Sequence, residues 1–471
     1  MNYPGLQYDE QSRSLLCPDD YVNPTPKPNY HLAVVGAGPA GLISAVGAAG
    51  LGARVALIEQ GMMGGDCLNV GCVPSKALLE ITKARPDVSF DDAFEHLRAV
   101  RAGIAPHDSV ARYNELGADV FLGAAKFDNG QLTVAGTKVN ARRIVICTGA
   151  KAAVPPIPGL REANPLTNES IFDLTQKPTS LAILGAGAIG AEMATVFARL
   201  GVEVHLFELA DRVLPLEIPA ASAAVQKELL ALGVHLHLGA GVEEIRQSAN
   251  GIEVVAQTTV SAERLLVALG RSPNTSELDL SSAGVQVDAQ GFIQTDDKLR
   301  TSNKKIYAAG DCTARLQFTH YADAQARVVV QNALFLPTAS VKGVIVPRCT
   351  YTQPEVASVE VPDCPDQYDT YHWDLAELDR SRTQVDGGGF VEVRTKKGSD
   401  QIVAATIVAD EAGELLASVM VLITNGLGLS ALAKVLLPYP TRSEFLKRLA
   451  DGYNRTRMTP LVAKIFKWWL R

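Results

Sequence analysis

Two cysteines, Cys67 and Cys72, are separated by four residues in the segment GGDCLNVGCVPSKALLE, which runs from Gly64 to Glu80. Thiols at this spacing can form a structural disulfide, hold a metal ion or work as a redox pair. A structural zinc site needs four ligands, usually paired Cys and His residues, and no second pair stands nearby. The seven cysteines in a chain without a secretory leader fit a reducing compartment, where cysteine pairs are usually catalytic. The pair therefore favours redox chemistry, and we expect no resident metal site.

The residues that follow Cys72 indicate the start of a helix. Pro74 suits a first helical turn, where its missing N–H costs nothing. A cysteine at a helix N-terminus is more acidic than a free one, whose pKa is about 8.5. Lys76 follows one turn later and adds positive charge. Because the thiolate is the reactive form in thiol–disulfide exchange, this placement predicts a reactive cysteine.

An internal repeat is expected to form the scaffold for this pair. Residues 32–60 and 181–209 share one pattern: an apolar strand, G-x-G-x-x-G, a helix, and a second apolar strand that ends in Glu. The repeated residues are Gly36, Gly38, Gly41 and Glu59, followed 149 positions later by Gly185, Gly187, Gly190 and Glu208. In such folds the glycine turn brings backbone N–H groups to a pyrophosphate, and the acid binds ribose hydroxyls. Two copies predict two dinucleotides that exchange electrons.

Glu208 bears on the choice of the second dinucleotide. A carboxylate at this place would repel the 2′-phosphate of NADPH, so the pattern favours NADH. Arg212 is close enough in sequence to leave NADPH open.

Composition narrows the class of protein further. The chain of 471 residues carries 44 basic and 51 acidic residues, a net charge of −7, which argues against nucleic acid as a partner. Its most apolar stretch, residues 417–438, is interrupted by Asn425, Gly426 and Gly428. A membrane span needs about 20 uninterrupted apolar residues, so we expect a buried helix and a turn there. With no leader at the N-terminus, we predict a cytoplasmic protein.

The cysteine segment resembles the redox motif of the flavin-dependent pyridine nucleotide–disulfide oxidoreductases, which include dihydrolipoamide dehydrogenase, glutathione reductase and mercuric reductase. From about Tyr30 other motifs follow in order: ICTGA, ALGRSPNT, IYAAGDC and YTQPEVASV. The resemblance implies an α/β fold with two Rossmann-like dinucleotide-binding domains and a C-terminal α+β dimerisation domain. The implied parts are an N-terminal arm (1–29), an FAD-binding domain (30–150 and 271–345), an NAD(P)-binding domain (151–270) and an interface domain (346–471).

The resemblance also implies roles for individual residues. Hydride would pass from NADH through FAD to the Cys67–Cys72 disulfide. Cys72 would be the charge-transfer thiol against the flavin, and Cys67 the outer thiol that meets the acceptor. Lys76 would stand beside flavin N5 and pair with Glu192. The implied cofactor contacts also include Gly149 and Gly270, with Asp311 at the ribityl chain of the flavin.

Family members are two-fold dimers in which a His-Pro-Thr-x-x-Glu motif enters the active site of the other subunit. In this chain Tyr439 stands at the His position, and Glu444 matches the Glu. Tyr has a pKa of about 10 against about 6.5 for His, so Tyr439 is a poor base near neutral pH but can donate a proton. This counts against dihydrolipoamide dehydrogenase and glutathione reductase. Mercuric reductases carry Tyr here, but they also end in a vicinal Cys pair, and this chain has no cysteine after Cys364.

We therefore predict a homodimeric FAD enzyme that uses NAD(P)H to reduce a small disulfide or a thiol-bound soft metal ion, similar to mercuric reductase. The alternatives are a dihydrolipoamide dehydrogenase with Tyr as its altered acid/base, and a non-catalytic flavin-bound redox sensor. The terminal segment LVAKIFKWWLR predicts a short apolar helix. This helix either packs against the dimer or a neighbouring domain, or contacts a membrane surface through Trp468 and Trp469.

Overall fold

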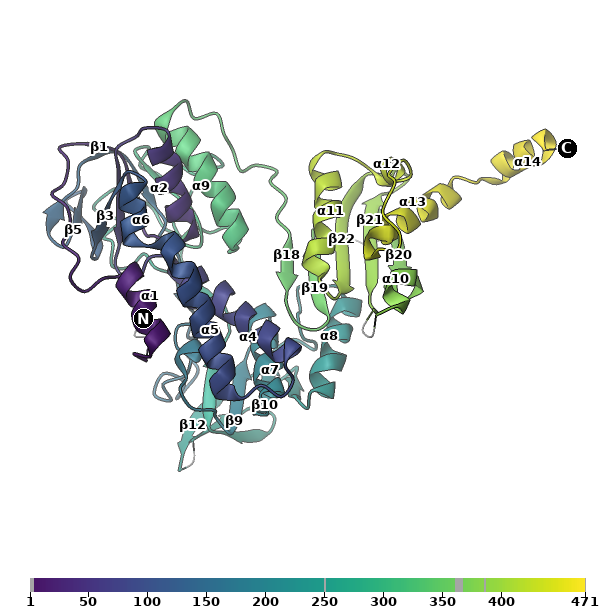
Figure 1. Ribbon diagram of the computed structural model, residues 1–471, viewed down its shortest axis with the longest axis horizontal. Helices are drawn as coiled ribbons and strands as arrows, with labels where there is room; N and C mark the ends of the chain where they lie inside the picture. Colours follow the sequence, from purple (N-terminus) through teal and green to yellow (C-terminus); the bar gives the residue numbers. More distant parts are fainter. Residues whose placement is uncertain (1–3, 250, 361–366, 385–386, 471) are drawn as a thin grey trace. The chain divides into compact units, whose positions relative to one another are not determined.

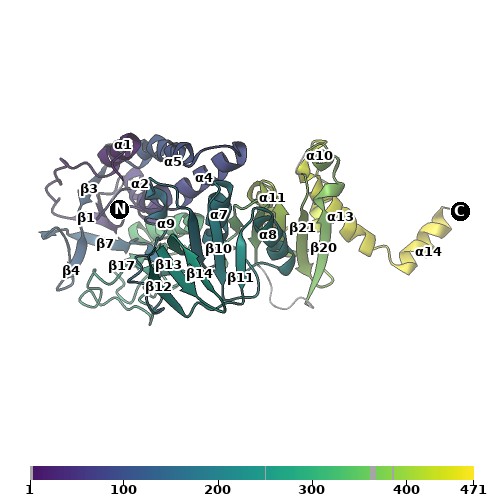
Figure 2. The same cartoon turned by 90° about the horizontal axis from the view of Figure 1, so that it is seen from below.

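The computed structural model describes residues 4–249, 251–360, 367–384 and 387–470, so Cys364 and Arg471 lie outside it. The chain forms two compact units (Figures 1 and 2). The first comprises Met1–Gly185, Val196–Phe207 and Gly241–Val344, and the second Ala186–Thr195, Glu208–Ala240 and Ile345–Arg471. The predicted α/β class is confirmed by the parallel and antiparallel sheets of these units.

The first unit is built on a parallel sheet. Its strands, in order across the sheet, are β17 (Ile306–Ala308), β7 (Ala141–Ile146), β1 (Tyr30–Val35), β2 (Val55–Glu59) and β3 (Ala118–Leu122). The strands are apolar along their length because helices and loops cover both faces of the sheet. Helices α2 (Pro39–Gly50) and α9 (Thr319–Leu334) lie side by side against it (Figure 1).

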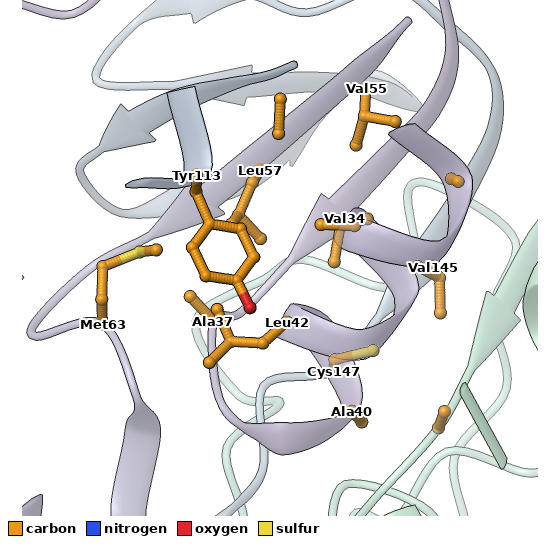
Figure 3. Close-up of a cluster of buried hydrophobic side chains, with 14 of the residues drawn as sticks. Val34, Ala37, Ala40, Leu42, Val55, Leu57, Met63, Tyr113, Val145 and Cys147 are labelled. Atoms are coloured by element: carbon orange, nitrogen blue, oxygen red, sulfur yellow. The ribbon is translucent and has the colours of Figure 1, made fainter. Parts of the chain in front are cut away.

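The core between sheet and helices holds the glycine turn in place. Val34, Leu57 and Val145 project from neighbouring strands toward Leu42 of α2, with Tyr113 beside them (Figure 3). All five side chains are nearly or fully buried. Cys147 is buried in the same cluster.

The second copy of the repeat builds a second parallel arrangement, whose residues are divided between the two units. β10 (Glu203–Glu208) and β15 (Arg264–Val267) both pair with β9 (Ser180–Leu184). Helix α7 (Ala188–Arg199) follows β9, and its bounds are those of α2 displaced by 149 positions. The repeat read from the sequence is therefore a structural repeat.

Smaller elements complete the first unit. Helices α4 (Cys72–Ala84) and α5 (Phe90–Ile104) lie side by side in both views of the chain (Figures 1 and 2). The others are α1 (Gln7–Leu16), α3 (Gly65–Asn69), α6 (Val110–Glu115), the antiparallel sheets β4 (Ala125–Asp128)–β5 (Gln131–Val134)–β6 (Thr137–Lys138) and β12 (Glu244–Ser248)–β13 (Gly251–Val255)–β14 (Thr259–Ala262), and the pair β8 (Ala150–Ala152)–β16 (Arg271–Pro273).

The second unit contains an antiparallel sheet covered by helices. The strand order is β18 (Arg348–Thr350), β19 (Glu355–Val359), β22 (Ile402–Ala409), β21 (Phe390–Lys396) and β20 (Tyr368–Asp374). Helix α11 (Ala412–Thr424) packs on β22 and is followed by a turn at Asn425 and Gly426, as predicted for this apolar stretch. The remaining helices include α8 (Pro219–Ala231), α10 (Asp379–Arg382), α12 (Leu429–Leu432), α13 (Phe445–Thr456) and α14 (Pro460–Trp469). Among the described residues, no helix is long and apolar enough to cross a membrane.

Candidate functional site

A cavity of about 560 Å³ lies in the first unit, where the strands of the parallel sheet end. Val35, Glu59 and Cys147 stand at or just beyond the carboxyl ends of β1, β2 and β7, and each lines the cavity. In open parallel sheets this edge is where nucleotides bind. Of the predicted site residues, the cavity is lined by Gly36, Gly38, Glu59, Cys67, Gly149 and Asp311.

The glycine turn at this edge has no room for side chains. At Gly36, where φ is +102°, a Cβ would meet the carbonyl oxygen of Cys147 at 2.4 Å. A Cβ on Gly41 would meet the carbonyl oxygen of Gly36 at 1.8 Å. Helix α2 then begins directly after Gly38, so its N-terminal N–H groups face the cavity edge. This arrangement fits a pyrophosphate, as the sequence predicts.

Glu59 is held by the same turn. Its Oε2 accepts a hydrogen bond from the Ala37 N–H at 2.7 Å, and its Oε1 accepts one from the Gly61 N–H at 2.8 Å. The carboxylate is therefore oriented at the cavity wall, where it could accept a hydrogen bond from a ribose hydroxyl of FAD. The volume lies within the range of about 300–1,000 Å³ that small-molecule sites occupy.

The second copy reproduces these contacts at the same offset. Glu208 accepts hydrogen bonds from the N–H groups of Ala186, at 2.8 Å, and Ala210, at 3.0 Å. A Cβ on Gly185 would meet the carbonyl oxygen of Ala268 at 2.5 Å. Gly187 comes just before α7, and Gly190 lies in its first turn. The second turn thus has the local geometry of a dinucleotide site.

The two cysteines differ in their surroundings. Cys67 lies in the short helix α3, is half-buried and lines the cavity, whereas Cys72 is exposed and begins α4 as predicted. The two sulfurs are not joined by a disulfide in this structure. The hydrogen bond with Cys72, together with burial, raises the pKa of Cys67, while a hydrogen bond with Thr319 opposes the rise. The contact between the two sulfurs therefore favours a proton shared within the reduced pair.

Thr319 is a site residue that the sequence did not reveal. It is the first residue of α9, it lines the cavity, and its Oγ1 lies 3.5 Å from Cys72 Sγ. More than 240 residues separate the two in the chain. It reaches the cysteines at the start of α9, a helix that packs beside α2.

Arg271 forms a second unpredicted feature beside the cysteines. Its guanidinium pairs with Asp66, the neighbour of Cys67, and its Nε lies 3.4 Å from Asp311 Oδ2. Burial raises the pKa of Asp311, and Asp66 adds to this effect while Arg271 opposes it. The motif ALGRSPNT contains Arg271, but the resemblance implies a cofactor contact only for its glycine. Gly270 accepts a hydrogen bond from the Ala153 N–H at 2.9 Å, beside the β8–β16 pair.

The remaining predicted site residues are divided between the two units. Lys76 lies on α4 of the first unit, and Glu192 on α7 within the second, so their pairing stays a prediction. Glu192 is buried and accepts a hydrogen bond from the Tyr351 N–H at 3.0 Å. Tyr351 opens the motif YTQPEVASV, so two recognised motifs meet at this carboxylate.

Tyr439 and Glu444 both belong to the second unit. Tyr439 is 70% exposed, and its hydroxyl donates a hydrogen bond to Asp379 Oδ2 at 2.7 Å. This bond raises the pKa of Tyr439, which weakens it further as a base. Glu444 forms an ion pair with Arg448 at 2.6 Å.

The N-terminal arm contacts the cysteine loop directly. The Met63 N–H donates a hydrogen bond to the carbonyl oxygen of Leu16 at 3.2 Å, at the end of α1. Leu16 is fully buried in the same cluster as Met63 and Leu68. The arm therefore packs immediately before the helix that carries Cys67.

A buried ion network reinforces this contact. Asp9 of α1 pairs with Arg101 at 2.6 Å and with Arg98 at 3.4 Å. Arg101 Nη1 also donates a hydrogen bond to the carbonyl oxygen of Asn69 at 2.9 Å, at the end of α3. Arg101 lies 3.8 Å from Asp173, whose pKa is raised to about 6, chiefly by burial.

Comparison with known proteins assigns this geometry to a family. Residues 30–326 match the pyridine nucleotide-disulphide oxidoreductases, and residues 346–450 match the dimerisation domain of that family. The chain belongs to this family. The match confirms the predicted flavoprotein fold and supports a homodimer. The exact limits of the four predicted parts stay a prediction.

The similar proteins fall into several named activities. A mercuric reductase of Staphylococcus aureus is 32% identical over 453 residues, 91% of this chain and 83% of that protein. A dihydrolipoyl dehydrogenase of Haloarcula marismortui is 29% identical, over 89% of this chain and 95% of that protein. A Cu(II) complex of the HOCl-induced flavoprotein disulfide reductase RclA of Escherichia coli has a TM-score of 0.83 at 29% identity, covering 88% of this chain and 98% of that one.

These relatives establish the general activity. The chain is an enzyme of the flavoprotein NAD(P)H-dependent disulfide oxidoreductase class, and its cofactors are FAD and a nicotinamide dinucleotide. The residues around the cavity fit FAD. Gly36, Gly38 and the start of α2 offer a pyrophosphate site, Glu59 a ribose contact, and Asp311 a polar group near the cysteines.

Proposed function

We propose that this enzyme resembles mercuric reductase and uses NADH to reduce a thiol-bound soft metal ion through the Cys67–Cys72 pair, with a small disulfide as the second candidate acceptor. The placement of Cys67 on the wall of the cavity that fits FAD carries this proposal. FAD, when bound, accepts a hydride from NADH and delivers two electrons to the disulfide. The protein residues then control where the protons and the acceptor go.

Reduction of the disulfide leaves two thiol groups with different tasks. Cys67 holds its proton, because its hydrogen bond to Cys72 and its burial both raise its pKa. Cys72, at the start of α4 and near the hydroxyl of Thr319, is the better place for negative charge. By family resemblance Cys72 is the thiol against the flavin, and Cys67 is the one that meets the acceptor. In the structure Cys67 lines the cavity and Cys72 is exposed beside Thr319, so this assignment of the two thiols stays a prediction.

Tyr439 favours a metal over a dithiol as the substrate. A dithiol must lose protons to react, and Tyr439, whose pKa is raised by Asp379, cannot take them near neutral pH. Thiolates that bind a soft metal ion are already deprotonated. Two-electron reduction of a divalent ion bound by two thiolates would restore the Cys67–Cys72 disulfide and release the carrier thiols and the reduced metal. In the proposed homodimer, Tyr439 and Glu444 come from the second subunit and line the acceptor site.

The choice of NADH rests on the second glycine turn. Glu208 is held in place by two backbone N–H groups, where it would repel a 2′-phosphate. Arg212, the cation that left NADPH open, donates a hydrogen bond to the carbonyl oxygen of Pro215 at 3.0 Å. Its guanidinium is thus already engaged on the protein.

The alternatives make distinct demands on the same site. A dihydrolipoamide dehydrogenase would need another base in place of the missing His, and the Haloarcula relative favours this activity. A flavin-bound redox sensor would reduce its cysteine pair once and then turn over slowly with every acceptor. Cytoplasmic localisation stays a prediction.

The decisive experiment is an acceptor screen on the FAD-loaded protein. The screen measures NADH oxidation with mercuric thiol adducts, small disulfides and lipoamide, beside Cys67→Ser and Cys72→Ser. We expect turnover with the metal adducts that both variants abolish. Turnover with lipoamide alone would favour the dehydrogenase, and no turnover with any acceptor would favour the sensor. An anaerobic NADH titration that gives no long-wavelength charge-transfer band, or a band that Cys72→Ser retains, would contradict the assigned role of Cys72.

A further inference from the structure

The C-terminal helix α14 presents large apolar side chains to solvent. None of its described residues is buried. The exposed fraction is 68% for Leu461, 74% for Trp468 and 77% for Trp469. Exposed apolar groups gathered on one element mark an interaction site rather than an ordinary surface.

The charged and apolar side chains of α14 lie on different sides of the helix. At about 100° per residue, Lys464 and Lys467 fall within about 60° of each other on the helical wheel. Leu461, Ile465, Trp468 and Trp469 cluster within about 100° on another side. The helix therefore has an apolar face and a basic face, and both are solvent-accessible.

Positive charge is concentrated in this part of the chain. The segment 452–471 carries no acidic residue and five basic ones, whereas the whole chain has a net charge of −7. The basic residues of the segment are Arg455, Arg457, Lys464, Lys467 and Arg471. The complementary partner of this helix is therefore a surface that is apolar inside and negatively charged outside.

We propose that α14 anchors the enzyme to an anionic lipid surface by lying in the plane of the interface. Its ten residues span about 15 Å, half the thickness of a hydrocarbon core, so it can lie on a bilayer but not cross one. Trp468 and Trp469 suit the level of the headgroups, and the lysine stems reach past them to the lipid phosphates. This binding site is independent of the electron acceptor proposed above.

The homodimer strengthens such an anchor. A single short amphipathic helix binds lipid weakly and reversibly. Two copies in one dimer make the second contact intramolecular, which raises the overall affinity without any new interaction. The family dimerisation domain ends at residue 450, so α14 lies beyond the matched region.

A second copy of α14 is the competing occupant of the apolar face. Pairing two such helices would bring their lysines into one assembly, and like charges at close range oppose association. An anionic lipid surface satisfies both faces at once. The two occupants are separated by measuring lipid binding and oligomeric state on the same samples.

The test is co-sedimentation of the FAD-loaded full chain with vesicles of phosphatidylcholine, alone or mixed with phosphatidylglycerol. We expect binding to the mixed vesicles that weakens with added salt. Lys464→Glu combined with Lys467→Glu should weaken it at least tenfold, since each basic residue near the surface is worth about 1 kcal/mol. Trp468→Ser combined with Trp469→Ser should weaken it as strongly.

A matched control distinguishes binding through α14 from nonspecific binding by exposed apolar side chains. Leu336 is an equally exposed apolar residue, 75% accessible, in the first unit, and Leu336→Ser should bind vesicles like the wild type. Two of the three tryptophans of the chain lie in α14, the other being Trp373, so quenching of their fluorescence by brominated lipid reports insertion directly. NADH oxidation with a water-soluble acceptor should be the same in all these variants.

Several outcomes would overturn the proposal. These are no sedimentation of the wild type with mixed vesicles, or equal sedimentation of the charge-reversed variant. A change from a larger assembly to a dimer in the Trp variant, without lipid binding by the wild type, would instead assign the apolar face to a second copy. Because sedimentation needs no electron acceptor, none of these results depends on the proposed reductase activity.

Discussion

The Asp9→Ala substitution tests whether the N-terminal arm holds the redox loop. Asp9 is 1% exposed, and it faces two buried guanidinium groups, those of Arg98 and Arg101. Removing it takes a carboxylate away from both cations, and Asp173 lies farther from Arg101 than Asp9 does, at 3.8 Å. Burial already lowers the pKa of Arg98, which shows that its charge is poorly solvated. Breaking a buried pair of this kind costs about 3–5 kcal/mol.

Loss of Asp9 should destabilise the segment around Cys67 through a chain of hydrogen bonds. Arg101 donates a hydrogen bond to the carbonyl oxygen of Asn69, and the Asn69 side chain donates to those of Met63, at 3.0 Å, and Gly65, at 2.9 Å. These bonds surround helix α3, on which Cys67 lies. We expect Asp9→Ala to speed hydrogen exchange over residues 63–72 and alkylation of Cys67 in the reduced protein. An opening free energy lowered by about 3 kcal/mol corresponds to roughly a hundredfold faster exchange in this segment.

A second ion pair of the same helix provides the control. Arg13 pairs with Asp19 at 2.8 Å, but both side chains are more than half exposed. Exposed pairs contribute about 0–1 kcal/mol, so Arg13→Ala should leave both readouts nearly unchanged. Urea unfolding, hydrogen exchange and Cys67 alkylation would be measured on the two variants together. The reasoning is refuted if Asp9→Ala behaves like Arg13→Ala in exchange over residues 63–72.

Three further predictions concern protons and cofactor choice. The pKa of Asp173 is raised to about 6. The stabilisation that its protonation gives the folded state is therefore present below about pH 4 and is lost as the pH rises through 6. Asp173→Asn should flatten the pH dependence of the urea midpoint in that window. Tyr439→His should raise turnover with dihydrolipoamide at least tenfold near neutral pH, because it restores a base of suitable pKa. Turnover is measured as NAD⁺ reduction, and an unchanged rate would argue against an acid/base role for this position. Glu208→Ala should lower the ratio of kcat/KM for NADH to kcat/KM for NADPH about tenfold, because the repulsion of a 2′-phosphate is removed. An unchanged ratio would mean that Glu208 serves only as a hydrogen-bond acceptor for the Ala186 and Ala210 N–H groups.

The parts of the site that the sequence predicted are those fixed by local backbone geometry. Gly36 and Gly41 are required because a Cβ at either position would collide with a carbonyl oxygen. The turn can therefore be predicted from a short local stretch of sequence. The start of α4 at Cys72 follows equally from a proline in its first turn. The contact of Glu59 with Ala37 recurs at Glu208 and Ala186, so the repeat could be read directly.

The parts that the sequence did not reveal depend on contacts between distant segments. Thr319 reaches Cys72 across 247 positions, and Arg271 reaches Asp66 across 205. Asp9 and Arg101, 92 positions apart, are ordinary charged residues in amphipathic helices until packing buries both. No spacing or periodicity distinguishes such residues from a solvated face, because their partners are chosen by the tertiary fold.

The unequal cysteines and the altered acid/base residue have a common chemical consequence. The hydrogen bond with Cys72 and burial raise the pKa of Cys67, and the hydrogen bond to Asp379 raises the pKa of Tyr439. Near neutral pH the acceptor site that we propose from these residues therefore supplies protons more readily than it removes them. An acceptor that arrives as a thiolate complex needs no base, and its released thiols can take up protons. Tyr439, which is a poor base for dithiol oxidation, is thus suited in our proposal to the reduction of a thiol-bound metal ion, in which the substrate arrives already deprotonated.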